Sequence, residues 1–215
     1  MNGHQARQPG LGAASPRRGS ARSECSWHAP LPYSGGVSST NLTREEARHR
    51  SVTIKVERYH VRIDVRGADA DGATHFTSST RVRFSTTEPD TFLDLLDGEI
   101  ESVIVNDEEV EPEYDGSRIQ LHGLHTHRKN LVIVTAKLPY QHTGQGLHRF
   151  VDPADGKVYL YTHFEAADSR RMYSVFEQPD LKAHVDFDVI APSDWRVASN
   201  QVHEDIREEE NGLLH

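Results

Sequence analysis

The body of the chain is dominated by short runs in which apolar and polar residues alternate. One run covers residues 52–56, and a second covers residues 59–65 in a register shifted by one residue. Alternation with a period of two is typical of β-strands that bury one face. The shift between the two runs predicts a bend or bulge near Glu57 and Arg58, because one extra residue exchanges the faces of a strand.

Similar runs, separated by turn residues, continue toward the C-terminus. They predict strands over residues 76–84, 100–105, 118–122, 130–138, 157–164, 183–190 and 195–199, with a short apolar run at 91–96. Leu131–Val134 is apolar on both faces, which predicts a central strand covered on both sides. Asn211 and Gly212 predict a hairpin turn, and Leu213 begins an arm that the chain does not complete. On this reading the polypeptide is a fragment truncated at its C-terminus.

Helical signals are confined to two places. Thr43-Arg44-Glu45-Glu46 matches a capping box and predicts a short helix that ends near residue 50. A single helical turn is expected near Arg170. Together with the strand pattern, these signals predict an all-β domain, a sandwich or saddle-like sheet of mixed and antiparallel strands over residues 41–215.

Composition separates this domain from the N-terminal tail. Residues 1–40 are rich in Gly, Ser, Pro, Arg and Ala and lack aliphatic periodicity, so we expect them to be disordered. Cys25 is the single cysteine, which excludes a disulfide framework and fits a reducing, cytoplasmic location. No run of 18 apolar residues and no secretory signal pattern occur, so neither a membrane partner nor export is expected.

The charge balance argues against a nucleic-acid partner. The whole chain carries −9, and the first forty residues carry about +3, so the remainder carries about −12. Binding to nucleic acid requires a basic face. An acidic body is compatible with cationic ligands, although most such charge is a solvated surface.

Glu165 is the residue that folding alone explains least well. It follows the predicted strand at 157–164 directly and precedes two small residues, so a ligand could reach its carboxylate. An ordinary surface ion pair with Arg170 or Arg171 is the competing interpretation, and surface pairs are common and weak. From spacing alone, the two interpretations stay open.

Several sequence blocks resemble the N-terminal domain of the aminopeptidase N family of zinc metallopeptidases, with the strongest similarity to actinobacterial members. The blocks, in order, are NLTREEA at 41–47, GLHRFVDP at 146–153, YTHFE at 161–165 and FEQPDLKA at 176–183. The resemblance implies that Glu165 helps to hold the free α-amino group of a peptide substrate. The family usually has Gln two residues earlier, where this chain has His163, so the neighbouring side-chain pocket would differ.

The resemblance also implies that zinc serves the intact family enzyme but is not bound by this chain. The catalytic domain of the family carries the His-Glu-x-x-His and Gly-x-Met-Glu-Asn motifs, and both are missing here. In His203-Glu204-Asp205-Ile206-Arg207 a cation stands where the second histidine ligand must be. We therefore expect no catalytic residue, no metal site and no peptidase activity in the isolated chain.

Two further possibilities belong to the sequence as it stands. His122, His125 and His127 could bind a transition metal adventitiously, but a polar turn is the better interpretation of the cluster. The whole chain could instead be a stand-alone β-sandwich binding module, or the product of a truncated, non-functional gene.

Overall fold

The computed structural model describes residues 41–202, 205–209 and 212–215, so the predicted tail, Cys25, His203 and Glu204 lie outside the described residues. The helices are α1 (Arg44–Thr53) and the short 3-10 helix η1 (Ser169–Arg171). The strands are β1 (Ile54–Asp64), β2 (His75–Thr86), β3 (Thr91–Asp94), β4 (Glu99–Val105), β5 (Glu108–Val110), β6 (Arg118–Leu121), β7 (Asn130–Pro139), β8 (Gly146–Val151), β9 (Val158–His163), β10 (His184–Ala191), β11 (Arg207–Glu209) and β12 (Gly212–Leu214).

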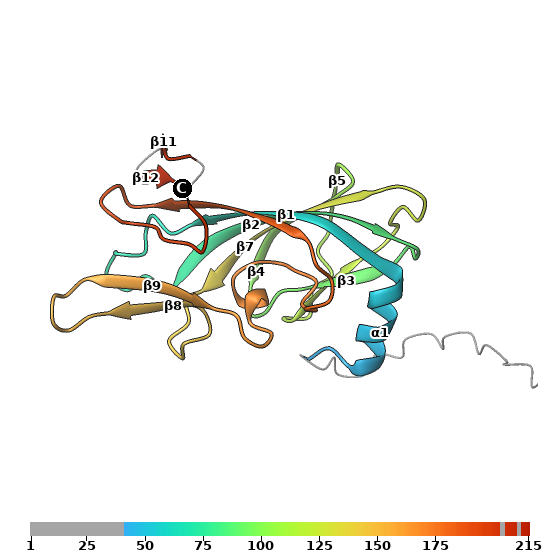
Figure 1. The fold of residues 1–215 in the computed structure, drawn as a ribbon, viewed down its shortest axis with the longest axis horizontal. Helices are drawn as coiled ribbons and strands as arrows, with labels where there is room; N and C mark the ends of the chain where they lie inside the picture. The colour runs from blue at the N-terminus through green and yellow to red at the C-terminus, as the bar shows by residue number, and fades with distance from the viewer. Residues whose placement is uncertain (1–40, 203–204, 210–211) are drawn as a thin grey trace, which may run out of the picture. The chain divides into compact units, whose positions relative to one another are not determined.

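An eight-stranded sheet in the order β11-β12-β10-β1-β2-β7-β4-β5 dominates the fold, with two-stranded ribbons β3–β6 and β8–β9 beside it (Figure 1). β1 and β10 run parallel, whereas the other strand pairs are antiparallel. The all-β prediction with mixed strands is confirmed.

The capping box at the start of α1 is confirmed. The Thr43 backbone N–H donates to Glu46 Oε2 at 2.7 Å, and the Glu46 N–H donates to Thr43 Oγ1 at 3.2 Å. These reciprocal bonds satisfy two donors that a helix start leaves free. The helix continues to Thr53, so Val52 is an exposed helical residue and β1 begins two residues later than predicted.

The core lies between one face of the large sheet and the two ribbons. Side chains of β1, β2 and β7 alternate in and out, and Leu93, Leu121 and Leu147 of the ribbons join the same buried cluster. In Figure 1 the β8–β9 ribbon and α1 accordingly lie on the same side of the large sheet. The predicted irregularity in β1 is confirmed as a register shift between Val56 and Arg58.

Three strand predictions need correction. Residues 195–199 form no strand, and the nearest end of β10, Ile190 and Ala191, pairs with β12 instead. The C-terminal hairpin has both arms, since β11 pairs with β12 through three residue pairs. β7 is central between β2 and β4, but Leu131 and Ile133 on its second face are only half-buried.

Candidate functional site

Glu165 lies in a turn immediately after β9. The turn spans residues 165–168 and is closed by a hydrogen bond from the Asp168 N–H to the Phe164 carbonyl at 3.1 Å. Glu165 is exposed, and the peptide bond that joins it to Ala166 is cis. Within the described residues its carboxylate has no hydrogen bond and no ion pair. The group is therefore free to bind something outside this domain.

The competing ion-pair interpretation is not supported, because both arginines have other partners. Arg170 is buried, and its Nε donates to the Ala167 carbonyl at 2.9 Å. The Arg171 Nε donates to Asp168 Oδ1 at 2.7 Å, and its terminal nitrogen lies 3.7 Å from Asp97. The sequence offered Asp168 as a partner as readily as Glu165, at the i,i+3 spacing.

Buried polar groups form hydrogen bonds with η1, which directly follows this turn. The Glu177 carboxylate accepts hydrogen bonds from the Ser169 hydroxyl and, at 2.8 Å, from the Arg170 N–H. Burial raises the pKa of Glu177 above its ordinary 4.5, against these hydrogen bonds, which lower it. The Glu177 N–H donates to Asp94 Oδ2 at 3.0 Å. Glu177 therefore connects η1, which directly follows the turn that carries Glu165, to β3.

Asp94 itself is held by a buried arginine from α1. Both terminal nitrogens of Arg50 contact Asp94 Oδ2, at 2.9 and 3.0 Å, with the two side chains only 3% and 2% exposed. The Arg50 guanidinium also lies over the rings of Phe92 and Phe176. Sequence reasoning missed this pair, although a single carboxylate inside the apolar run at 91–96 was the available signal.

His163 ends β9 on the outward face of the β8–β9 ribbon. Period two places it on the same face as Tyr159 and Tyr161, and Tyr161 stacks on His148 with a centroid distance of 4.7 Å. The His163 side chain is exposed and has no hydrogen-bond partner among the described residues. The structure thus places both predicted residues, His163 and Glu165, at the same exposed end of β9.

Exposed apolar side chains are concentrated on the β8–β9 ribbon and on β10. Six of the ten large apolar side chains exposed in the described part of the chain lie on β8, β9 and β10, at 41–51% exposure: Phe150, Val151, Tyr159, Tyr161, Val185 and Phe187. Phe164, directly before Glu165, packs edge-on against Tyr173, which in turn packs against Phe187. Exposed apolar side chains that are concentrated on a few neighbouring strands suggest a contact with another protein part.

Neither of two surface hollows in the described part of the chain includes the two predicted residues. Surface hollows of about 660 and 610 Å³ lie elsewhere, and neither Glu165 nor His163 lines them. A substrate groove at Glu165 would therefore need a second wall.

The described residues contain no group of three or more His, Cys, Asp or Glu side chains that could hold a metal ion. In the histidine cluster, both ring nitrogens of His122 already contact carboxylates, Asp90 at 3.0 Å and Glu113 at 3.2 Å. The residues of this domain that the structure describes therefore do not fit the zinc of the family. Among these residues there is also no helix of the length and apolarity needed to cross a membrane.

Known proteins similar to this chain are aminopeptidases. The chain is 45% identical over 165 residues to aminopeptidase N of Streptomyces lividans and 25% identical over 164 residues to probable aminopeptidase 1 of Saccharolobus solfataricus. These alignments cover 75% and 74% of this chain but only 19% of each relative. The chain thus spans about a fifth of the length of the curated relatives it matches.

Solved structures show the same fold. Aminopeptidase A of Legionella pneumophila, in complex with aspartic acid, matches with a TM-score of 0.63 at 18% identity, over 75% of this chain and 19% of its own. An M1 zinc metallopeptidase of Deinococcus radiodurans matches with a TM-score of 0.58 at 13% identity, over 75% of this chain and 38% of its own. The profile of the peptidase M1 N-terminal domain matches residues 55–215, and the chain therefore belongs to this family.

Proposed function

We propose that this domain anchors the N-terminus of a peptide substrate in a zinc-dependent aminopeptidase, with Glu165 as the anchoring group. The observation that carries the proposal is the state of Glu165: an exposed carboxylate with no described partner, on a turn that buried groups hold in place. Such a group can accept a hydrogen bond from a ligand without first breaking one of its own.

Electrostatics explains why this contact selects a chain terminus. A peptide α-amino group has an unperturbed pKa of about 7.7–8.0, so it is largely protonated near neutral pH. A carboxylate binds that ammonium through a charge-assisted hydrogen bond, whereas an internal peptide bond offers no cation. His163, at the end of the same strand, would contact the first side chain of the substrate.

A catalytic domain would supply the second wall and the zinc. The exposed apolar side chains of β8, β9 and β10 are the surface on which such a domain would pack. Zinc would activate a water for attack on the scissile carbonyl. The residues of this chain would bind and orient the substrate, and we expect the chain alone to release no amino acids. A reducing, cytoplasmic location is part of the proposal and is supported by the single cysteine.

A chimaera tests the anchoring role. Residues 41–215 would replace the matching part of the Streptomyces lividans aminopeptidase N, and Glu165→Gln would be compared with Glu111→Gln, an exposed carboxylate outside the site. Loss of a charge-paired contact typically costs about 2–5 kcal/mol, so kcat/KM for an aminoacyl chromogenic substrate should fall at least about thirtyfold in the Glu165 variant.

The control variant should retain the activity of the unmodified chimaera. Equal activity of the two variants would refute the anchoring role of Glu165. Chelator-sensitive release of amino acids by the isolated 215-residue chain would refute the division of labour between the domains.

A further inference from the structure

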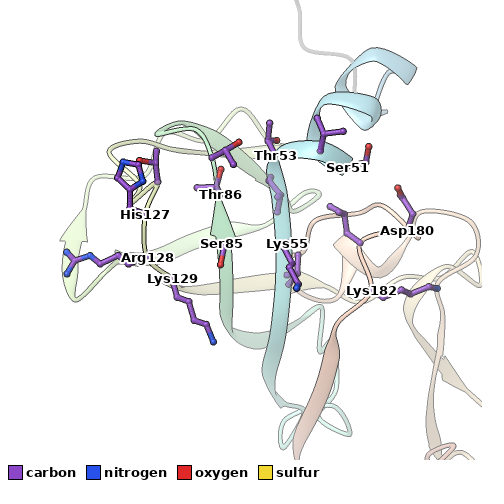
Figure 2. A pocket seen from close by; sticks show the side chains of 16 residues that line it. Ser51, Thr53, Lys55, Ser85, Thr86, His127, Arg128, Lys129, Asp180 and Lys182 are labelled. Carbon is purple, nitrogen blue, oxygen red and sulfur yellow. The ribbon is translucent and has the colours of Figure 1, made fainter.

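A second surface feature, unrelated to Glu165, is a hollow at the end of the large sheet where β1 begins and β2 ends. Its volume of about 660 Å³ is within the range of roughly 300–1,000 Å³ typical of small-molecule sites. We name it the Lys55 pocket. Its walls come from residues 51–56, 85–87, 126–129 and 180–182 (Figure 2).

The Lys55 pocket reverses the charge of the protein that surrounds it. The whole chain has 33 acidic and 24 basic residues, yet the lining contains four cations and one carboxylate, Asp180. Hydroxyl groups make up much of the remaining lining: Ser51, Thr53, Ser85, Thr86, Thr87 and Thr126. Ammonium groups among hydroxyl donors form an environment suited to an oxyanion.

The pairing of the four cations determines which of them can bind a ligand. Lys129 Nζ lies 2.8 Å from the Glu57 carboxylate, so its charge is largely balanced. Arg128 points away from the pocket in Figure 2, toward the ring of His125, which it contacts at 2.5 Å. Lys55 and Lys182 have no hydrogen bond or ion pair with any described residue. These two exposed lysines carry the uncompensated charge of the Lys55 pocket; in Figure 2 the Lys182 side chain extends away from Lys55, so it would have to rotate toward Lys55 for both to contact one ligand.

Hydrogen-bond donors lie beside this charge. Ser85 is the direct cross-strand partner of Lys55, and Figure 2 shows it between the Lys55 and Lys129 side chains. The hydroxyls of Ser51, Thr53 and Thr86 already bond backbone carbonyls. The side chains of Ser85 and Thr87 have no described partner, so their hydroxyls can donate to a ligand.

We propose that the Lys55 pocket binds a small phosphorylated anion, with Lys55 and Lys182 as its charge partners and the hydroxyls of Ser85 and Thr87 as neutral donors. A phosphate monoester carries about −1.5 to −2 at pH 7, which matches two uncompensated ammonium groups. Its several acceptor oxygens suit point-charge lysines and scattered hydroxyls, whereas a planar carboxylate is better recognised by a bidentate arginine. The volume also leaves room for an organic group on the phosphate.

Calorimetric titration of the full 215-residue chain with sodium pyrophosphate, and separately with AMP, tests the proposal. Saturable binding of either ligand is expected, and the tighter of the two shows whether the phosphate is inorganic or carried by an organic group. Lys55→Gln should weaken binding about tenfold, and Lys55→Gln with Lys182→Gln about a hundredfold, as expected for lost hydrogen bonds to charged groups. Lys157→Gln removes an exposed lysine in the turn before β9 and should change affinity less than twofold.

Amide NMR shifts supply a second readout that does not depend on the variants. Pyrophosphate should shift amides at 53–55, 85–87 and 180–182. The proposal is overturned if neither ligand binds, if Lys157→Gln weakens binding as much as Lys55→Gln, or if the shifts centre on β8 and β9.

Discussion

Replacing Arg50 by Met should destabilise the domain more than any exposed charge change. Arg50 joins α1 to β3 through two contacts with Asp94, and both side chains are almost fully buried. Methionine keeps much of the volume beneath Phe92 but removes the charge. Asp94 would then remain as a buried carboxylate whose only hydrogen-bond donor among the described residues is the Glu177 N–H.

The magnitude follows from what the substitution leaves behind. Removing one partner of a buried ion pair typically costs about 3–5 kcal/mol, because the other charge is left uncompensated. Arg50→Met combined with Asp94→Leu removes both charges and leaves the Glu177 N–H without its acceptor, a loss of about 1–3 kcal/mol. The double variant should therefore be more stable than Arg50→Met alone.

Urea titration followed by circular dichroism measures these free energies of unfolding, provided that the transition is two-state. Arg58→Met is the matched control, since Arg58 pairs with Asp186 on the surface with side chains 53% and 48% exposed. Exposed pairs contribute only about 0–1 kcal/mol. If Arg50→Met cost no more than Arg58→Met, or if the double variant were the least stable, the buried pair would not have the role assigned to it.

Three further changes test other parts of the structure. Burial raises the pKa of Glu177, so the contribution of Glu177 to stability is present below pH 4.5 and is lost as pH rises through the folded-state pKa. In urea titrations, Glu177→Gln should therefore become less destabilising relative to the wild type between pH about 4 and 7. The hydrogen bond that the His122 ring donates to the Asp90 carboxylate raises the pKa of His122, so the contribution of His122 to stability is present below pH 6.5 and is lost as pH rises through the higher folded-state value. The NMR titration midpoint of His122 should therefore fall in Asp90→Asn. Gly146→Ala places Cβ 2.6 Å from a neighbouring arginine side chain at φ +57°, and should lower the melting temperature more than Gly156→Ala, which meets nothing at φ +71°.

Local features of the fold could be predicted because neighbouring residues determine them. The capping box at Thr43 needs only four residues, and the shifted alternation around Glu57 exposes the bulge directly. Residues 195–199 were wrongly predicted as a strand from their alternation, whereas the nearest end of β10, Ile190 and Ala191, pairs with β12. Whether a sheet edge is free depends on chain that lies elsewhere in the sequence.

In the candidate site, too, local features could be predicted and long-range contacts could not. The position of Glu165 after a strand was visible in the sequence, whereas its lack of a partner depended on which carboxylate Arg171 would bind. The support beneath it joins Arg50, Asp94 and Glu177, which are 44 and 83 residues apart in sequence. No periodicity records such a contact, so the hydrogen-bond network beside the turn could not be predicted.

The exposure of Glu165 also explains why anchoring would need a second domain. A carboxylate in water gains little from a cation, because at 4 Å the attraction between unit charges is about 1 kcal/mol in bulk water and about 4 kcal/mol at an effective dielectric constant of 20. Covering the apolar side chains of β8, β9 and β10 would exclude water beside Glu165. The attraction of Glu165 for a cation would then approach the value at the lower dielectric constant. The surface that would hold a catalytic domain would therefore also strengthen the electrostatic contact at Glu165. A charged residue in place of Phe187 should then weaken both domain association and substrate binding.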